Sequence, residues 1–428
     1  MKHLRNHIIN HPHYNKVKHW GKLIFITGSA QVIVQVIGLV SGILVIRLLP
    51  VEEYALYTLA NTMLGTMTVL SDGGISNGVM ALGGKVWEDK TKLGVVVSTG
   101  LDLRRKFAIG ALAVSVPILC YLLMHHGASW ITTILIAASL IPAFYAALSD
   151  NLLQIAPKLH QAITPLQKNQ INVSIGRLLL TGLTLFAFPW AFVAILASGI
   201  PRIWGNFKLR KISNNFADHE QLPGVEERKE LLKTVKRILP SAIYFAFSGQ
   251  ITIWLISIFG ETTSIAQIGA LGRLAVIFTL ATSIVQMLII PRFSRLQNER
   301  RLIIKNFVRV ELLLFVVAII MVLIAKIFSN QFLWVLGIDY FGLNKELLFI
   351  MISGSINFVG MCTNGLLMAR NIVMSPIIYL PLIIFIQIII LFFVPLNNII
   401  GVTSYAIIST FIIYMIRLIY FIIQMKRI

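Results

Sequence analysis

Apolar runs of about twenty residues recur along the whole chain and are separated by short polar segments. A hydrocarbon core about 30 Å thick needs roughly 20 apolar residues for each spanning helix. The runs are continuously apolar, whereas the strands of a membrane barrel would alternate between apolar and polar residues. The mean hydropathy is +0.82, which is too high for a soluble globular domain. We therefore predict an all-α integral membrane protein.

The hydropathy pattern predicts about twelve transmembrane helices in two sets of six. The segment 208–237 between the sets is polar and basic, and it is expected to be a cytoplasmic linker with an amphipathic helix on the membrane surface. Two six-helix lobes around a central cavity, 23–207 and 238–428, would resemble transporters built from two structural repeats. The spans are expected near 23–46, 54–79, 107–124, 130–150, 170–187, 190–207, 239–258, 265–289, 306–326, 346–368, 375–395 and 400–423.

The basic residues predict how the chain is oriented in the membrane. Lys and Arg number 37 against 17 Asp and Glu, and they concentrate in alternate loops. The positive-inside rule then places those loops and both termini, including an N-terminal tail of residues 1–22, in the cytoplasm. We expect a multi-pass protein of a bacterial inner membrane. Because the positive charge is spread between spans, nucleic acid is not an expected partner.

Two arginines inside predicted spans indicate an anionic ligand. Arg177 lies one turn from Thr181 on a polar stripe of span 170–187, and Arg273 lies in span 265–289. Burying an arginine at mid-membrane costs about 2.5–3.5 kcal/mol, so it needs a polar partner or a ligand. A guanidinium group binds phosphate or carboxylate oxygens bidentately. The alternatives are a structural salt bridge from Arg177 to Asp72 and snorkelling of Arg273 to the outer interface.

Further polar residues on the stripes are candidates for substrate contact. Asp72 and Asp150, near the cytoplasmic ends of their spans, are candidates for coupling to H⁺ or Na⁺. The alternatives are pairing with a buried arginine or an interface position at a helix end for Asp72, and a helix cap for Asp150. Arg309 and Glu311 are expected to be interface charges at the start of span 306–326. The other candidate substrate-binding residues are Gln31, Gln35, Asn61, Thr181, Ser248, Asn357 and Asn364.

No metal site or other cofactor is expected. The five histidines of the first 22 residues have no Cys or carboxylate beside them. Cys120 and Cys362 lie in separate apolar runs, so neither zinc spacing nor a disulfide framework is present in the pattern.

Three motifs resemble those of the polysaccharide or O-antigen flippases, members of the multidrug/oligosaccharidyl-lipid/polysaccharide exporter superfamily. Residues 47–57, RLLPVEEYALY, are similar to their R-x-L-x-P-E-E-Y-G-x-Y turn, with Ala55 in place of the glycine. Residues 70–78, LSDGGISNG, resemble their D-x-G helix end. Residues 270–274 and 291–294 resemble their A-x-R-L and P-x-x-S pattern. Span 23–46 lacks the carboxylate that many drug and cation antiporters of the superfamily carry there.

The resemblance implies a V-shaped pair of lobes that flips an undecaprenyl-diphosphate-linked oligosaccharide from the cytoplasmic to the periplasmic leaflet by alternating access. Such flipping supplies O-antigen, capsule or exopolysaccharide synthesis, and it implies a polysaccharide polymerase and chain-length proteins as partners beside the lipid bilayer. On this implication Arg177 and Arg273 contact the diphosphate, and the polar stripes face the sugar.

Other functions remain open at the level of sequence. A multidrug or metabolite antiporter would share the fold, although cationic drugs prefer carboxylates and aromatic rings to arginines. A membrane enzyme acting on the same lipid is disfavoured, because the outer loops are short and carry no paired acids. A scramblase or a purely structural channel is also compatible with the pattern.

Overall fold

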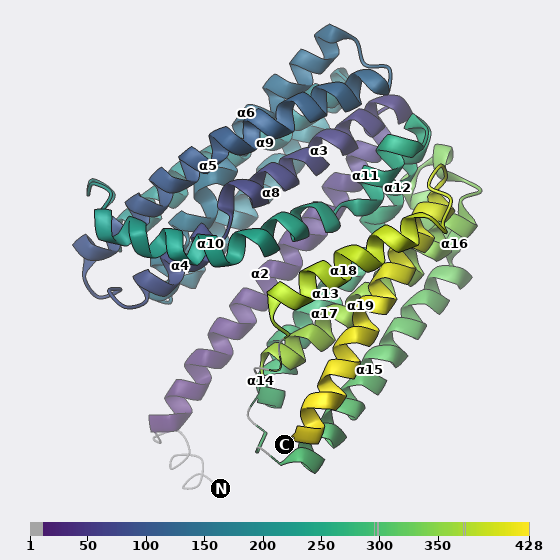
Figure 1. The fold of residues 1–428 in the computed structure, drawn as a ribbon. Helices are drawn as coiled ribbons and strands as arrows, with labels where there is room; N and C mark the ends of the chain where they lie inside the picture. The colour runs from purple at the N-terminus through teal and green to yellow at the C-terminus, as the bar shows by residue number, and fades with distance from the viewer. Residues whose placement is uncertain (1–11, 295, 298, 371, 373, 428) are drawn as a thin grey trace, which may run out of the picture.

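In the computed structural model, which describes residues 12–294, 296–297, 299–370, 372 and 374–427, the regular elements are helices (Figure 1). The first half contains α2 (Pro12–Leu48), α3 (Val51–Asp72), α4 (Ile75–Gly83), α5 (Lys90–His125), α6 (Trp130–Leu153), α7 (Ile155–Leu159), α8 (Ile163–Ala187) and α9 (Ala191–Asn214). The second half contains α10 (Val225–Ser248), α11 (Ile251–Phe259), α12 (Thr262–Leu274), α13 (Val276–Leu288), α14 (Ile290–Ser294), α15 (Arg300–Ile327), α16 (Ser329–Leu336), η1 (Ile338–Tyr340), α17 (Asn344–Met368), α18 (Pro376–Leu391) and α19 (Ile399–Arg427).

Each of the twelve predicted spans coincides with helix. Among the described residues, eight helices are long and apolar enough to cross a membrane, and α10 with α11 forms a further span bent by 54°. The apolar α18 is shorter, and α3 and α9 complete the twelve. The polar α3 is tolerated because much of it, including Tyr54 and Thr58, is buried inside the protein. The chain is thus a multi-pass helical membrane protein.

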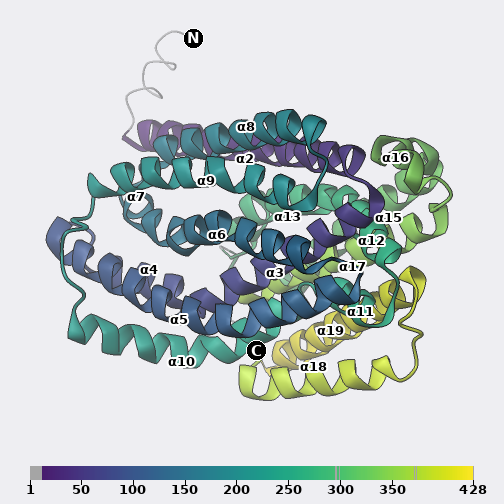
Figure 2. The same ribbon diagram turned by 90° about the horizontal axis from the view of Figure 1, so that it is seen from above.

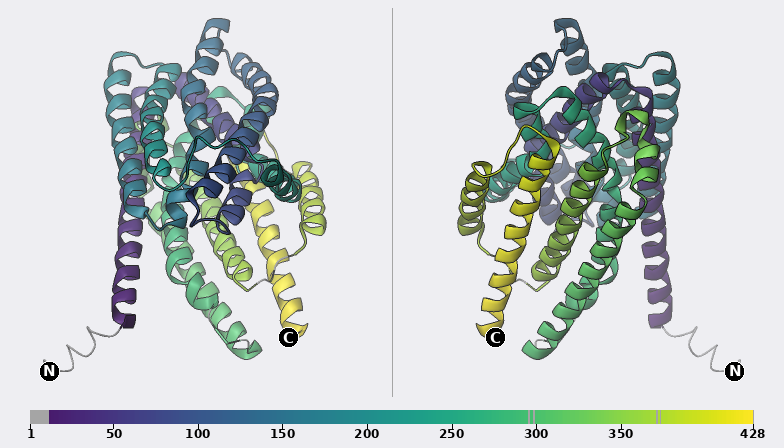
Figure 3. Two further views of the ribbon diagram at one scale, coloured as in Figure 1. Left: turned by 90° about the vertical axis from the view of Figure 1, so that its left-hand side faces the viewer. Right: turned by 90° about the vertical axis from the view of Figure 1, so that its right-hand side faces the viewer.

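The helices form two lobes. Helices α2, α3, α5, α6, α8 and α9 pack on one another in the N-lobe, and α11, α13, α15, α17, α18 and α19 do so in the C-lobe (Figure 1). The described part of α2 begins at the same end of the molecule at which α19 finishes (Figure 3). We call this the terminal end, and the opposite end the far end. Residues 1–11 of the predicted tail lie outside the described part of the chain.

Direct contacts join the lobes at the far end. Arg47, in the last turn of α2, donates hydrogen bonds from Nε and Nη2 to the carbonyl oxygens of Val335 (2.9 Å) and Trp334 (2.6 Å) on α16. Gly269 of α12 packs so closely on Thr58 of α3 that a Cβ there would lie 2.6 Å from the Thr58 Oγ1. The side chain of residue 269 must therefore be absent for the lobes to meet.

A histidine makes a third contact between the lobes. His126, just after α5, places Nε2 2.8 Å from the carbonyl oxygen of Ser257 and Nδ1 3.0 Å from Oγ1 of Thr262. The carbonyl oxygen can only accept, so Nε2 carries a hydrogen and donates it. Burial lowers the pKa of His126 below its ordinary value. A neutral imidazole is therefore the form that suits the joined far end.

Helix α10 covers the terminal end of the N-lobe. Its Leu231 and Val235 are buried against Ile75, Val79 and Leu93 of α4 and α5. Figure 2 shows α4, α5 and α10 side by side. The predicted amphipathic helix therefore buries Leu231 and Val235 in protein. Its position on the membrane surface stays a prediction. Within the predicted linker 208–237, helix α9 continues to Asn214 and α10 begins at Val225.

Candidate functional site

Three half-buried arginines from both lobes interact electrostatically. Arg177 of α8 interacts electrostatically with Arg202 of α9 and with Arg273 of α12, and also with the hydroxyl group of Tyr57 on α3. We call Arg177, Arg202 and Arg273 the arginine cluster. Like charges repel one another, so the cluster concentrates positive potential around Arg177, and Asp150 offsets part of the charge of Arg202.

Arg273 extends from the C-lobe onto the N-lobe. Its side chain passes over Gly42 of α2, where a Cβ would lie 3.3 Å from the Arg273 Cδ. Its guanidinium group lies beside the hydroxyl groups of Tyr54 and Tyr57, with which it interacts electrostatically. The two tyrosine rings are stacked with their centroids 5.9 Å apart. Arg273 is therefore turned inward to the lobe contact, and the snorkelling alternative does not describe its position.

Arg177 lacks a compensating acid. Its electrostatic neighbours are two other arginines and a tyrosine, and the buried Nε has no hydrogen-bond partner within the described part of the chain. One turn further along α8, the buried Oγ1 of Thr181 is likewise without a partner among the described residues. Buried polar atoms without partners are rare in proteins. This face of α8 therefore has hydrogen-bond donors that a polar ligand or water could use.

The alternative salt bridge from Arg177 to Asp72 is wrong, because Asp72 pairs with Arg104. The Arg104 Nη1 lies 3.2 Å from the Asp72 Oδ1, and the arginine side chain is 1% exposed. Asp72 also caps α4 by accepting from the backbone N–H of Gly74 (3.3 Å) and of Ser76 (3.4 Å). The turn needs φ of +50° at Gly73 and +95° at Gly74, which glycine adopts without strain.

Asp150 belongs to the same polar network in the N-lobe. Its Oδ1 accepts from Nδ2 of Asn206 on α9 at 2.6 Å, and its carboxylate interacts electrostatically with Arg202 and Arg104. The two predicted coupling carboxylates, Asp72 and Asp150, are thus both held by fixed neighbours. Coupling to H⁺ or Na⁺ through either of them stays a prediction.

The remaining predicted substrate contacts are spread over both lobes. Gln31 and Gln35 are half-buried on α2, which packs along the arginine-bearing α8. Asn61 donates from Nδ2 to the carbonyl oxygen of Tyr57 at 3.0 Å, so it lies one helical turn from a tyrosine that interacts with Arg177 and Arg273. In the C-lobe, Ser248, Asn357 and Asn364 lie on α10 and α17; Asn357 is exposed, and the Asn364 Nδ2 lies 3.3 Å from the Sδ of Met368.

The sequence predicted that Glu311 is an interface charge. That prediction is wrong, because Glu311 is buried. It is 7% exposed in the middle of α15 and accepts hydrogen bonds from Thr363 and Tyr414. Arg104 and Arg202 were also missed: Arg104 lies before the predicted span 107–124, and Arg202 lies within span 190–207 but was not singled out as a candidate. Tyr54 and Tyr57 could have been found from the sequence, since both belong to the motif in residues 47–57.

The comparisons with known proteins agree on one fold. No protein-family model and no curated protein sequence matches the chain. Among solved structures, an inward-facing conformation of a multidrug resistance MATE family transporter of the MOP superfamily matches with a TM-score of 0.68 at 13% identity, over 92% of this chain and 96% of that one. An outward-facing conformation of such a transporter matches with a TM-score of 0.63 at 12% identity, over 95% of both chains. A Vibrio cholerae MATE transporter matches with a TM-score of 0.59 at 15% identity, over 96% of this chain and 97% of that one. The chain therefore has the fold of the MATE transporters of the MOP superfamily.

Proposed function

We propose that the protein is an alternating-access transporter that flips an undecaprenyl-diphosphate-linked oligosaccharide from the cytoplasmic to the periplasmic leaflet. The observation that carries the proposal is the arginine cluster, in which Arg177 faces Arg202 and Arg273 and has no acidic partner among its electrostatic neighbours. A cation held inside a membrane protein without a counter-ion is costly. A bound anion would remove that cost.

A diphosphate suits the cluster better than a single carboxylate does. Two phosphate groups offer several oxygens to three guanidinium groups, each of which can bind them bidentately. The hydroxyl groups of Tyr54 and Tyr57, beside Arg273, can donate further hydrogen bonds. Because Arg273 comes from the C-lobe and Arg177 from the N-lobe, one ligand could bridge the two lobes and bias how they pack.

The far-end contacts support alternating access. Arg47, His126 and Gly269 join the lobes there, beside buried apolar residues of α3 and α12. Each lobe also has its own packed helices, so on this proposal the contacts at the far end separate while the lobes stay folded. If the terminal end is cytoplasmic, a protein joined at its far end is closed toward the periplasm. Substrate would then enter the cluster from the cytoplasmic side.

A second function is favoured by the comparisons themselves. The inward- and outward-facing structures that the chain resembles are described as multidrug resistance transporters. A cation-coupled antiporter of drugs or metabolites would use the same lobes. The arginine cluster counts against cationic drugs, because it would repel them. Anionic compounds would remain possible substrates of such an antiporter.

The test is flipping of a fluorescent lipid-linked oligosaccharide in proteoliposomes, followed by a membrane-impermeant quencher. The wild type should flip faster than protein-free vesicles. Arg177→Ala, Arg202→Ala and Arg273→Ala should each slow flipping at least about tenfold, since a hydrogen bond to a charged group is worth about 1.5–3 kcal/mol. Arg309→Ala, which removes an exposed arginine of α15, should flip at the wild-type rate.

Two results would contradict the proposal. If wild-type vesicles flip no faster than protein-free ones, the protein is not a flippase for this lipid. If the cluster variants flip at the wild-type rate, the arginines do not contact the diphosphate. Uptake of a drug that the cluster variants lose would instead favour the antiporter.

A further inference from the structure

We infer that Glu311, with Thr363 and Tyr414, forms a proton-binding site inside the C-lobe that couples transport to a proton gradient. The inference rests on the proposed transport function for its coupling step, although not for the site itself. None of the motifs in the sequence points to these three residues, and the arginine cluster does not include them.

The site joins three membrane-spanning helices. Oε1 of Glu311 on α15 lies 2.7 Å from Oγ1 of Thr363 on α17, and its Oε2 lies 3.0 Å from the hydroxyl oxygen of Tyr414 on α19. The exposed fractions are 7% for Glu311, 0% for Thr363 and 3% for Tyr414. Each carboxyl oxygen therefore has one hydrogen-bond partner from the protein, and all three side chains are buried.

No cation compensates Glu311. Within the described residues, no Lys, Arg or His nitrogen lies within 4.0 Å of its carboxyl group. Arg417, one turn beyond Tyr414, directs its guanidinium group to the carbonyl oxygen of Gly360 and the hydroxyl group of Tyr379. The other titratable groups beside Glu311 are Tyr414 and Cys362, which are neutral at neutral pH. An ionised carboxylate here would be a buried, unpaired charge, and the protonated acid removes that cost.

The hydrogen-bond geometry accommodates both protonation states. Oγ1 of Thr363 lies 2.8 Å from the carbonyl oxygen of Val359 as well as 2.7 Å from Glu311, and its hydroxyl group has one hydrogen to donate. When Glu311 is protonated, its Oε1–H donates to Thr363, which donates onward to Val359. When Glu311 is ionised, the Thr363 hydrogen turns to the carboxylate. A proton can thus bind and leave while only one hydroxyl hydrogen reorients.

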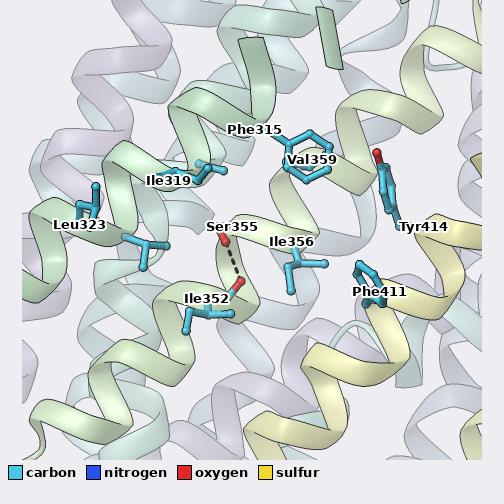
Figure 4. Close-up of a pocket in the computed structure, with 11 residues that line it drawn as sticks. Phe315, Ile319, Leu323, Ile352, Ser355, Ile356, Val359, Phe411 and Tyr414 are labelled. Atoms are coloured by element: carbon cyan, nitrogen blue, oxygen red, sulfur yellow. Dashed lines mark hydrogen bonds between the residues drawn. The ribbon is translucent and has the colours of Figure 1, made fainter. Parts of the chain in front are cut away.

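The cavities around the site indicate from which side the proton exchanges. A groove of about 470 Å³ runs between α15 and α19, with Arg300 and Lys426 at its terminal end and Glu311 and Tyr414 among its lining residues. The neighbouring cavity of about 310 Å³ begins at Phe315 and Tyr414 and is lined almost wholly by apolar side chains (Figure 4). Both spaces are lined mostly by apolar side chains, but only the groove includes Glu311 and has charged residues, Arg300 and Lys426, at its terminal end. The proton is therefore expected to exchange with solvent at the terminal end of the groove.

A proton fits the site better than Na⁺ does. The oxygens of Glu311, Thr363 and Val359 are already at hydrogen-bonding distances of 2.7 and 2.8 Å from one another. Sodium would have to separate them to gain its own oxygen ligands. The proton needs no such movement, so addition of Na⁺ should leave the titration of the site unchanged.

The site can be tested by infrared difference spectroscopy of the full-length protein in lipid nanodiscs during a pH titration. The wild type should show a protonated carboxylic acid band that disappears as the pH rises, and Glu311→Gln should lack it. Glu226→Gln, which alters an acid that is 79% exposed, should keep it. Thr363→Val keeps Glu311 but removes a hydrogen bond that is stronger for the ionised form than for the protonated form, so the midpoint should rise by about one pH unit.

Transport supplies the second measurement. In proteoliposomes that carry an imposed pH difference, flipping of the lipid-linked oligosaccharide by the wild type should respond to that difference, and Glu311→Gln should lose the response. Identical infrared titrations of wild type and Glu311→Gln, a midpoint that moves with Na⁺, or a Glu311→Gln variant that still responds to the pH difference would overturn the inference. Absence of flipping by the wild type, with the infrared band intact, would instead contradict the proposed function.

Discussion

The buried ion pair between Arg104 and Asp72 makes the sharpest prediction about stability. Arg104→Met should destabilise the protein because it leaves the Asp72 carboxylate without its cation. The arginine is 1% exposed and the aspartate 22% exposed, and their charged atoms are 3.2 Å apart. Removing one partner of a buried pair costs about 3–5 kcal/mol. Because Asp72 keeps its hydrogen bonds from Gly74 and Ser76, we expect the lower end, about 3 kcal/mol.

The double variant separates loss of the pair from loss of packing. Arg104→Met with Asp72→Asn removes both charges, so no uncompensated charge remains and the methionine still fills part of the space. The double variant should therefore be more stable than Arg104→Met alone. Lys106→Met provides the matched control, since Lys106 lies half a turn away on α5, is 56% exposed and pairs with Asp102 on the surface. Its cost should stay below about 1 kcal/mol.

The assay is equilibrium unfolding in mixed detergent micelles, followed by tryptophan fluorescence. Wild type, both single variants, the double variant and Lys106→Met should be compared under one set of conditions. If Arg104→Met were no less stable than Lys106→Met, the pair would not contribute as its burial implies. If the effects of Arg104→Met and Asp72→Asn simply added, the two side chains would not interact.

Three further predictions concern the far end. Glu53 accepts from the backbone N–H of Ala191 at the start of α9 (2.7 Å), so Glu53→Gln should lower the free energy of unfolding by about 1–2 kcal/mol in the same micelle assay. Gly269→Ala should force the lobes apart at Thr58, raising hydrogen–deuterium exchange at the far end; unchanged exchange would contradict that close packing. Because the pKa of His126 is lowered when the lobes are joined, this contact is stable above the ordinary histidine pKa of about 6.5 and is lost as the pH falls through the lowered value. Exchange at the far end should therefore rise on acidification in the wild type and not in His126→Gln.

The approximate positions of the membrane-spanning segments could be predicted from the sequence, whereas the residues at which the helices begin and end could not. An apolar run of twenty residues has few alternatives to spanning the bilayer, so all twelve predicted spans contain helix. Span 107–124 in fact begins at Lys90, because the charged turns before it remain helical inside the N-lobe. Hydropathy treats Arg104 as a loop residue, although it is buried against Asp72. Burial by protein and burial by lipid cannot be distinguished from composition.

The arginine cluster was predictable in part. The spacing of Arg177 and Thr181 placed both on one face, and the structure buries polar atoms of both without partners among the described residues. Arg202 was missed because no polar stripe in span 190–207 drew attention to it; only the packing of α8 on α9 brings it near Arg177. Glu311 could not be found from local pattern, since its partners Thr363 and Tyr414 are 52 and 103 residues away in the chain. Such sites depend on how distant helices pack.

Binding of undecaprenyl diphosphate to the protein in lipid nanodiscs tests the central claim most directly, with the neutral alcohol undecaprenol as the comparison ligand. The two share the same apolar chain and differ in the diphosphate. The wild type should bind the diphosphate more tightly than the alcohol, with a preference that weakens as salt is added, and the variant carrying Arg177→Gln, Arg202→Gln and Arg273→Gln should lose that preference. Equal affinity of the wild type for the diphosphate and the alcohol would contradict the claim that the arginine cluster binds an anionic headgroup.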